Sequence, residues 1–456
     1  MIGIKEVFSV QKFLFNSNET KSISFRIAHL KKLKEVIQTN ELALMKAIHE
    51  DFGKSSIETY ITELSIIYKE IDYFIKYIKQ LSKPKKVSTS LVNFPSRGYI
   101  IPEPLGVTLV IGAWNYPYQL SLVPAIAAIA AGNTAIVKPS ELPKQTSAVL
   151  ADLINSHFPK ELIYVVEGGI DETTDLLALP FDKIFFTGST AVGKIVYAAA
   201  AKNLTPVTLE LGGKSPTFVL KDCDIVLTAK RLVWAKLLNA GQTCVAPDYV
   251  LVESSIKEAL VTQLKFEMDK YPKSSSEQVD HYLKIINMNH FDRLAKFLGS
   301  PKVCYGGKVD RDQRFISPTL LDEVNWDDEI MQEEIFGPIL PILSFDQLEE
   351  AIYHVKLHSK PLACYVYGKD KQKTNRILKE VSFGGGAVND SLMHLTEHSL
   401  PFGGVGASGM GSYHGKSGFE TFSHFKSVLS KSFWFESPLK YPPYSEGIMK
   451  LLKRFL

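Results

Sequence analysis

The sequence predicts an α/β protein with two parallel-sheet domains in series. From Gly106 onward, short apolar runs alternate with helical segments, and the same alternation restarts after Leu211. Apolar strands separated by helices are typical of parallel sheets that are covered on both faces. The 456-residue chain is 45% hydrophobic and 22% charged, which is an ordinary globular composition.

The first eighty residues are predicted to be helical. Apolar residues recur there at three- and four-residue spacing, with basic residues between them: Phe25, Ile27, Leu30, Leu33, Val36 and Ile37. Residues 51–54 break this pattern, and a further helix is expected over 58–80. Residues 81–105 contain prolines and short β-prone runs, so we expect a hairpin that leaves the domain and returns.

The first α/β unit is predicted to have strands over 107–111, 134–138, 163–168 and 183–188. Helices are expected over 120–131, 143–157 and 193–201. The second unit is predicted to have helices near 223–239 and 255–270, and strands over 249–254 and 364–368.

Charge, cysteine content and apolar runs exclude several classes of protein. The net charge is 52 − 49 = +3, which gives no reason to expect a nucleic-acid partner. The four cysteines form no C-x-x-C pair, so neither a disulfide framework nor a metal site is expected, and a reducing cytoplasm suits them. Residues 120–137 are too short and too interrupted to span a bilayer.

Residues 188–195, "GSTAVGKI", nearly match the phosphate-binding loop G-x-x-x-x-G-K-[ST] of nucleotide hydrolases. Ile195 stands where a hydroxyl would bind magnesium. A helix N-terminus after a parallel strand still favours an anion, because its free N–H groups point outward. Taken alone, the loop is either a phosphate site or an ordinary strand-to-helix turn.

Cys244, in "NAGQTCVAPDY", follows the end of a helix and precedes Pro247. A cysteine at such a junction can be exposed, whereas Cys364 is predicted to lie in a strand core. Catalysis by Cys244 would require positive potential or a base nearby, since the thiolate is the nucleophile. The alternative is a small buried apolar side chain.

Three other positions could carry chemistry. Glu210 lies among apolar residues before a double glycine, where burial would raise its pKa toward the general-base range; alternatively it pairs with Lys214. Asn115 follows a strand and could donate to an oxyanion, or serve as a turn residue. Lys138 ends the next strand, with Glu141 three residues on, where ligands of open α/β sheets gather.

Together these stretches resemble the aldehyde dehydrogenase superfamily. The resemblance runs from about residue 25 to about residue 445 and depends on "AWNYP", "KPSE", "FTGST", "LELGGKSP", "GQTC", "EEIFGP" and "PFGGVGASGMG" in the family's order. The short N-terminus, "DFGKS", "FPSRGYIIPEPLG", "APDYVL" and "KYPPY" resemble the class 3 branch, which includes fatty aldehyde dehydrogenases.

The resemblance implies a covalent mechanism. Cys244 would attack the aldehyde, and Asn115 and the Cys244 backbone N–H would stabilise the oxyanion. After hydride transfer to a nicotinamide, water activated by Glu210 would hydrolyse the thioester to the acid. Glu334 is an alternative carboxylate. The expected substrates are medium- or long-chain aliphatic or aromatic aldehydes.

The resemblance also implies a cofactor site and explains the loop at 188–195, which would hold a dinucleotide diphosphate without magnesium. Lys138 and Glu141 would bind the adenosine ribose, Glu334 the nicotinamide ribose, and Phe336 would pack beside the nicotinamide. The loop residues implied are Gly188, Ser189, Val192 and Gly193. Glu141 favours NAD, and NADP is possible in class 3.

The implied organisation is an aldehyde dehydrogenase-like fold with a small β oligomerisation arm. The NAD(P)-binding domain would span 1–80 and 106–210, and the catalytic thiol domain 211–395. Residues 81–105 and 396–430 would be an oligomerisation hairpin and strands, the hairpin pairing with strands of a second subunit. A C-terminal tail would span 431–456, and the expected state is a homodimer.

The tail contains a basic amphipathic pattern. Ile448, Leu451, Leu452 and Phe455 fall on one side of a helix and Lys450, Lys453 and Arg454 on the other. Such a helix could touch an anionic membrane surface weakly, or simply be a frayed or docked terminus. We therefore expect a cytoplasmic protein, and the tail leaves peripheral contact with the membrane as an option.

Three rival functions stay open at this point. A family member could transfer the acyl group to coenzyme A, although Glu210 favours hydrolysis. From another class, the chain could be a P-loop NTPase. The third is a non-catalytic relative, which would not need Cys244, Glu210 and Asn115; all three are present.

Overall fold

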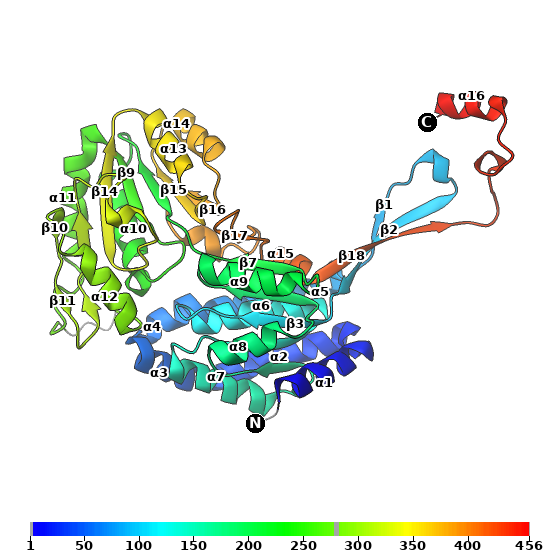
Figure 1. Ribbon diagram of the computed structural model, residues 1–456, viewed down its shortest axis with the longest axis horizontal. Helices are drawn as coiled ribbons and strands as arrows, with labels where there is room; N and C mark the ends of the chain where they lie inside the picture. The colour runs from blue at the N-terminus through cyan, green and yellow to red at the C-terminus, as the bar shows by residue number, and fades with distance from the viewer. Residues whose placement is uncertain (1–2, 278–281, 456) are drawn as a thin grey trace.

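The computed structural model describes residues 3–277 and 282–455. It consists of two α/β bodies with a long β arm that projects from one of them (Figure 1). The two-domain α/β prediction is confirmed.

The first body is built on a sheet in the order β17-β7-β6-β3-β4-β5. Its parallel strands are β3 (Val107–Ile111), β4 (Thr134–Lys138), β5 (Ile163–Val165), β6 (Lys183–Thr187) and β7 (Val207–Glu210). The short strand β17 (Gly409–Met410) pairs antiparallel with β7. The predicted strands are present, although β5 and β6 end earlier than expected.

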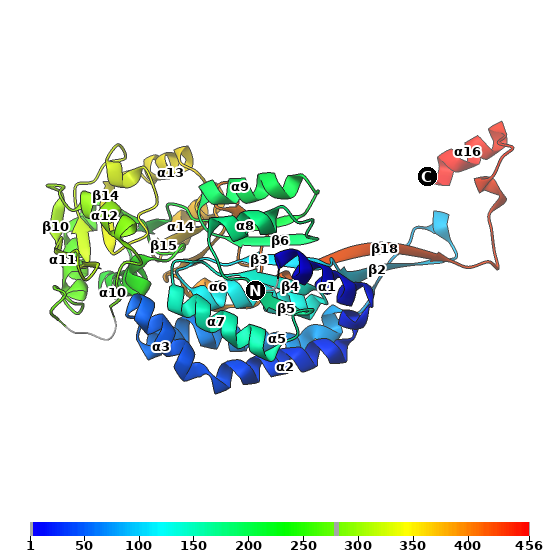
Figure 2. The same cartoon turned by 60° about the horizontal axis from the view of Figure 1, so that its bottom comes forward.

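Helices cover both faces of this sheet (Figure 2). On one face, Leu109 packs in the cluster that includes α1 (Ile4–Asn16), α8 (Ile170–Leu177) and α9 (Thr190–Ala201). On the other face, Val110 packs with α6 (Pro117–Ala131), whose residues are all buried, and α7 (Lys144–His157). Alternate residues of a strand point to opposite faces of the sheet. Because helices cover both faces, the residues that point to either face must be apolar.

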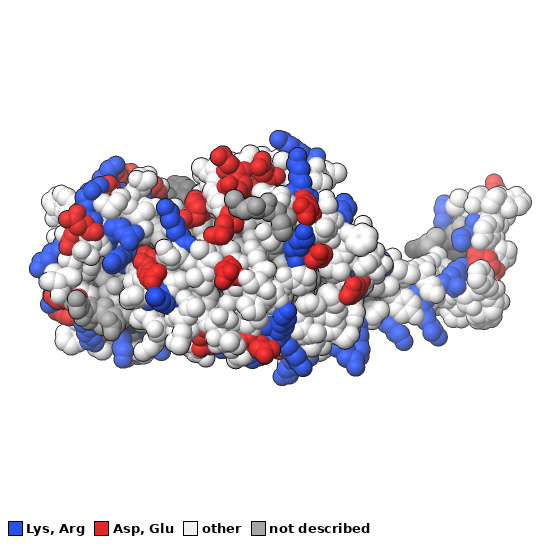
Figure 3. All heavy atoms as spheres, turned by 90° about the horizontal axis from the view of Figure 1, so that it is seen from below, with Lys and Arg blue, Asp and Glu red and all other residues white. Residues whose placement is uncertain are grey.

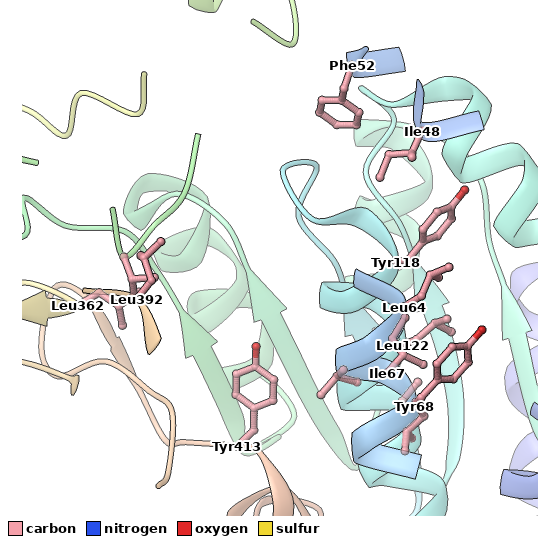
Figure 4. Close-up of a cluster of buried hydrophobic side chains, with 14 of the residues drawn as sticks. Ile48, Phe52, Leu64, Ile67, Tyr68, Tyr118, Leu122, Leu362, Leu392 and Tyr413 are labelled. Carbon is pink, nitrogen blue, oxygen red and sulfur yellow. The ribbon is translucent and has the colours of Figure 1, made fainter. Parts of the chain in front are cut away.

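The N-terminal helices form an outer layer over α6. They are α2 (Ile23–Thr39), α3 (Glu41–Phe52), α4 (Ser56–Thr59) and α5 (Ser65–Leu81), with a π-helical turn over Tyr60–Leu64 between α4 and α5. Figure 4 shows Leu64, Ile67 and Tyr68 of this layer beside Tyr118 and Leu122 of α6. The helix predicted over 58–80 is therefore interrupted by one π turn.

The second body has a sheet in the order β10-β13-β14-β9-β8-β15-β16. The strands are β8 (Pro216–Val219), β9 (Tyr249–Glu253), β10 (Val303–Tyr305), β13 (Thr319–Leu321), β14 (Ile339–Phe345), β15 (Ala363–Tyr367) and β16 (Gly385–Val388). All pairings are parallel except that of β10 with β13. A separate small hairpin joins β11 (Val309–Asp310) to β12 (Phe315–Ile316).

The helices of this second body, in its described residues, are α10 (Ile225–Leu237), α11 (Lys257–Met268), α12 (Met288–Phe297), α13 (Leu348–Leu357) and α14 (Lys371–Glu380). The helices predicted near 223–239 and 255–270 correspond to α10 and α11. Cys364 is fully buried in β15, as its apolar context predicted.

The arm is an antiparallel sheet of β1 (Lys85–Val87), β2 (Ser96–Pro104) and β18 (Ser423–Lys431). Within this chain, β2 pairs with β18, from Ser423↔Pro104 to Lys431↔Ser96. The expected pairing of the hairpin with strands of a second subunit stays a prediction. Only the last part of 396–430 lies in the arm. Strand β17 and α15 (Gly415–Thr421) pack on the first body.

The tail beyond the arm includes α16 (Glu446–Phe455), which agrees with the helical pattern of the sequence. Lys450 and Lys453 are exposed, whereas the side chains of Leu451, Leu452, Arg454 and Phe455 lie outside the described part. Within the described residues, none of the helices has the length and apolarity that a membrane span requires. Figure 3 shows basic and acidic side chains intermixed over the bodies and basic ones along the arm.

Candidate active site

A cavity of about 340 Å³ lies between the two bodies, where the β7 end of the first sheet faces the loop after α10. Cys244 and Glu210 both line it. The other walls come from the π turn, α5, α6, α10 and the loops that follow α10 and β16. They include the side chains Ile66, Leu120, Trp234, Leu238, Leu392, Leu395, Phe402, Tyr413 and His414. Most of this lining is apolar or aromatic.

Cys244 lies in the loop that follows the 3₁₀ turn Leu238–Gly241, and its side chain is half-buried. Burial raises the pKa of the Cys244 thiol, and the carboxylates of Glu334 and Glu210 raise it further. The backbone N–H groups of Cys244 and Val245 lower this pKa in part. The thiol is therefore protonated at neutral pH until a base removes its proton.

Glu210 ends β7 and is 3% exposed, and neither of its carboxylate oxygens has a hydrogen-bond partner among the described residues. Burial raises its pKa well above the ordinary value. The alternative pairing with Lys214 does not occur, because the Lys214 ammonium donates to Asp248 at 2.7 Å. A buried, unpaired carboxyl costs stability, so its place in a cavity is a functional feature.

Asn115 follows β3 and is buried. Its side-chain Nδ2 donates to the backbone oxygen of Gln242 at 3.0 Å, two residues before Cys244. The amide nitrogen carries two N–H donors, so one is left for a ligand oxygen. The fold thus brings the strand-end asparagine to the nucleophile loop, although the two are far apart in the sequence.

The predicted cofactor residues of the first body lie at the carboxyl ends of its parallel strands. Lys138 ends β4, is 2% exposed and donates to the Pro139 oxygen at 2.7 Å, and its Nζ is 4.0 Å from a Glu141 oxygen. Gly188 follows β6. Ligands of open α/β sheets bind at this edge, where the carboxyl ends of the strands meet.

Helix α9 starts at Thr190, three residues before the predicted 193. Ser189 is its N-cap and accepts from the Val192 N–H at 3.4 Å. Val192 and Ile195 are exposed, so the first turn of the helix faces solvent. A Cβ on Gly193 would lie 2.6 Å from the Leu211 side chain, so glycine lets the helix pack closely against the end of β7.

Glu334 and Phe336 come from the second body and reach the same region. The Gly213 N–H donates to the Glu334 carboxylate, while burial above all raises the Glu334 pKa to about 8. A Cβ on Gly212 would lie 2.0 Å from a Glu334 oxygen. Phe336 has a φ of 54°. Its ring packs edge-on against the ring of Trp114, with the two ring centroids 5.3 Å apart.

Several residues of the site were not singled out from the sequence. The Tyr116 hydroxyl and the Thr243 Oγ1 are 2.6 Å apart and both line the cavity beside Cys244. Tyr116 lies within "AWNYP", so its motif was a signal. Trp234, Tyr413 and His414 had no such signal, because only the tertiary structure turns them toward the cavity.

The fold and the site define a class: a two-domain α/β protein with a cysteine and an unpaired carboxyl in one cavity between the bodies, and an exposed helix N-terminus at the carboxyl edge of the first sheet. A model of the aldehyde dehydrogenase family matches residues 9–428. The chain belongs to this family.

Named relatives lie in the same branch. The chain is 49% identical over 454 residues to 4,4'-diaponeurosporen-aldehyde dehydrogenase of Staphylococcus aureus, covering 99% of each. It is 45% identical to aldehyde dehydrogenase family 3 member A2 of Mus musculus, covering 97% of this chain and 92% of the relative. It is also 45% identical to the dimeric NADP-preferring aldehyde dehydrogenase of Rattus norvegicus, covering 97% and 98%.

The substrate-bound state of Staphylococcus aureus AldH is a solved structure with a TM-score of 0.97 and 49% identity, covering 100% of both chains. The protein is therefore a class 3-like, NAD(P)-dependent oxidoreductase that oxidises aldehydes to carboxylic acids. These matches do not favour a P-loop nucleotide hydrolase or acyl transfer to coenzyme A.

Proposed function

We propose that Cys244, Asn115 and Glu210 carry the aldehyde oxidation. The observation that supports this most strongly is their convergence: Cys244 and Glu210 line one cavity, and Asn115 is hydrogen-bonded to the nucleophile loop. No other cysteine of the described residues lines that cavity.

The reaction starts when the Cys244 thiol passes its proton to Glu210, which releases it to solvent, and the sulfur bonds to the carbonyl carbon. The carbonyl oxygen becomes an oxyanion, which the Asn115 amide and the Cys244 backbone N–H stabilise by donating hydrogen bonds. Loss of hydride from the former carbonyl carbon leaves a thioester on Cys244.

Glu210 then acts as the general base. It takes a proton from a water molecule, whose oxygen bonds to the thioester carbon, and the sulfur leaves to give the free acid. A buried carboxyl with a raised pKa is suited to this role, since it can accept a proton near neutral pH. Glu334 is less suited, because its carboxylate already accepts the Gly213 N–H.

The residues present fit a nicotinamide dinucleotide. The exposed first turn of α9 follows Gly188 at the sheet edge, and Lys138 is a buried cation at the same edge. When bound, the nicotinamide supplies the acceptor for the hydride. Gly188, Ser189, Val192 and Gly193 would hold the diphosphate, Lys138 and Glu141 the adenosine ribose, Glu334 the nicotinamide ribose, and Phe336 would pack beside the ring.

We propose NAD as the preferred cofactor, with NADP also accepted. Glu141 is about half exposed beside Lys138, and its carboxylate favours a free ribose hydroxyl over a phosphate. The rat relative is named NADP-preferring, which supports NADP as a second cofactor. Initial rates with each cofactor at a fixed aldehyde concentration test the preference.

The apolar cavity walls support medium- or long-chain aliphatic or aromatic aldehydes as substrates. Ile66, Leu238, Leu392 and Phe402 offer no polar partner to the substrate chain. A panel of aldehydes of increasing chain length tests this, and kcat/KM should rise with length. A preference for the shortest aldehydes would contradict it.

Replacing Cys244 with serine tests the mechanism. Reduced-nicotinamide formation from an aldehyde should disappear in Cys244→Ser and persist in the control Cys364→Ser, whose sulfur lies in the core of β15. Full activity of the Cys244 variant would overturn the proposal, and a requirement for coenzyme A would redirect it to acyl transfer.

We propose a cytoplasmic homodimer that contacts membranes weakly. The arm exposes apolar side chains, among them Leu91, Phe425, Leu429 and Phe433, and the rat relative is named dimeric.

The membrane contact would be made by helix α16, where exposed Lys450 and Lys453 suit an anionic surface. Removing residues 446–456 should abolish co-sedimentation with anionic vesicles; unchanged sedimentation would refute the membrane contact.

A further inference from the structure

The nucleophile loop contains two successive residues in a conformation that L-amino acids rarely adopt. Asn239 has φ 56° and ψ 31°, and Ala240 has φ 50° and ψ 35°, although neither is glycine. Left-handed backbone at non-glycine residues is strained and persists only where surrounding contacts impose it. The contacts around Asn239 therefore show what holds the loop.

Asn239 connects the two loops of the site. Its side-chain Nδ2 lies 3.0 Å from the backbone oxygen of Asn115 and 3.0 Å from that of Gln242. The Gln242 oxygen also accepts the Asn115 amide at 3.0 Å. The side-chain direction of Asn115 is thus fixed by the same carbonyl that Asn239 holds.

A buried carboxylate fixes Asn239 in turn. Its backbone N–H donates to the Glu58 Oε1 at 2.9 Å, and Glu58 is 8% exposed. Glu58 belongs to α4 in the first body, whereas Asn239 follows α10 in the second. This hydrogen bond therefore joins the two bodies directly behind the nucleophile loop.

A second buried carboxylate holds the other loop. Glu63 is fully buried, and its Oε2 accepts the N–H groups of Tyr118 at 2.9 Å and Gln119 at 3.0 Å, at the start of α6. Its Oε1 is 3.3 Å from the Lys54 ammonium. Glu63 thereby fixes the chain just after Asn115.

The π-helical turn explains how one segment reaches both loops. In an α-helix, residues five apart point about 140° away from each other. The i→i+5 pattern over Tyr60–Leu64 narrows this angle, so Glu58 and Glu63 both face the site. A π turn inside a helix is often associated with a functional site.

We propose that Glu58 and Glu63 form a clamp that positions the oxyanion-binding groups: Glu58 holds the Cys244 loop through Asn239, and Glu63 holds the Asn115 loop. The clamp depends on the proposed roles of Cys244 and Asn115. Both glutamates are positioning residues, since their contacts with the site run through Asn239, Tyr118 and Gln119.

Glu58→Gln and Glu58→Leu test the clamp. Glutamine keeps a side-chain oxygen that can accept the Asn239 N–H, so its kcat should stay within about threefold of wild type. Leucine removes the acceptor and should lower kcat about tenfold or more with little change in aldehyde KM, because the misplaced donors act mainly in the transition state.

A double-mutant cycle with Asn115→Ala separates positioning from a general structural role. If Glu58 acts through the oxyanion site, Glu58→Leu should lower kcat less in the Asn115→Ala background than in wild type, because one of the donors that it positions is already gone. Losses that multiply fully, or a Glu58→Leu variant within about twofold of wild type, would overturn the clamp.

Asn239→Gly keeps the test valid if Glu58→Leu does not fold. Glycine adopts the left-handed backbone without strain and keeps the N–H for Glu58, but it removes the side-chain bridge. This variant should fold normally and lose kcat about tenfold or more, whereas wild-type kcat would contradict the clamp.

Glu253→Leu is the matched control. It also removes a buried carboxylate, one whose oxygen is 2.5 Å from the Lys373 ammonium in the second body, and Glu253 does not line the cavity. Its melting temperature should fall while kcat stays within about twofold of wild type. Failure of the proposed function is recognised separately, as activity retained by Cys244→Ser in an otherwise wild-type chain.

Discussion

Cys244 differs from the usual activated cysteine in its electrostatic surroundings. The groups that influence its pKa most, after burial, are the carboxylates of Glu334 and Glu210, and both disfavour the thiolate. Activation therefore requires a base rather than a resident cation. Glu210 can take the proton of the Cys244 thiol first and the proton of the hydrolytic water later, since it is unpaired and lines the same cavity.

The pKa shifts predict that turnover increases with pH. The Glu334 pKa is raised to about 8, and those of Glu210 and Cys244 are raised as well. A base must be deprotonated to act, so kcat should increase as the pH is raised above neutral. A pH–rate profile that falls over this range while the protein stays folded would contradict it.

The same shifts have the opposite effect on stability. A carboxyl whose pKa is higher in the folded than in the unfolded state stabilises the fold below the unfolded value, and this contribution is lost as the pH rises through the folded value. Melting temperature should therefore fall over the range where activity rises, which thermal unfolding at several pH values measures. Glu210→Gln should weaken this fall.

Glu210→Gln is expected to separate the two halves of the reaction. The Cys244 proton must then pass to solvent instead of Glu210, so one reduced nicotinamide per site should still form, in a burst slower than that of the wild type. Hydrolysis lacks its base, so steady-state turnover should fall about 10²- to 10⁴-fold. Glu334→Gln is the control, and a larger loss of turnover there would identify Glu334 as the base.

At the scale of elements, the site is formed where strands and helices end. Glu210 and Lys138 terminate β7 and β4, Gly188 and Asn115 follow β6 and β3, and Cys244 follows α10. Strand ends leave side chains and N–H groups that the sheet does not use. A rigid sheet therefore places chemically different residues at one edge.

The close approach of the β7–β8 loop to the second body can be tested with Gly212→Ala. The added Cβ would lie 2.0 Å from a Glu334 oxygen, so the Glu334 side chain must move. The KM for the cofactor should rise about tenfold or more, with a small effect on aldehyde KM. Gly169→Ala is the control, because nothing lies within 4 Å of its added Cβ; equal effects of both changes would refute the prediction.

At the scale of the whole molecule, the arm is the feature that a single chain leaves incompletely covered. Strand β18 exposes Phe425 and Leu429, which alternate onto the same face, and Phe433 just beyond is fully exposed. Large apolar side chains on a projecting sheet indicate an interface. A second copy of the chain is the partner we expect.

Phe425→Asp combined with Leu429→Asp should convert the dimer to a monomer, because charged side chains on that face oppose burial. Sedimentation equilibrium measures the mass, and activity of the resulting monomer shows whether the site depends on assembly. Lys426→Ala on the same strand removes only an exposed ion pair with Glu103 and should leave the dimer intact. A wild-type protein that sediments as a monomer would refute the expectation.

Much of the fold could be predicted because apolar periodicity records burial. The strands from Val107 to Thr187 and the paired helices followed from local pattern alone. Helix starts were less predictable: α9 begins at Thr190, since Ser189 caps it, and α6 begins at Pro117. Pairing of β2 with β18 of the same chain had no local signal, because strand pairing is non-local.

The sequence by itself determined the two α/β units, the motif residues and the chemical type of each candidate, because burial patterns and reactive groups are local properties. Only the tertiary structure decided that Glu210 is unpaired, that Lys214 binds Asp248, and that Asn115 meets the loop of Cys244. The left-handed Asn239, held by Glu58, was also decided there. The hydrogen-bond partners and the burial of a polar side chain depend on which distant segments the packed core brings together, and no local sequence pattern records that.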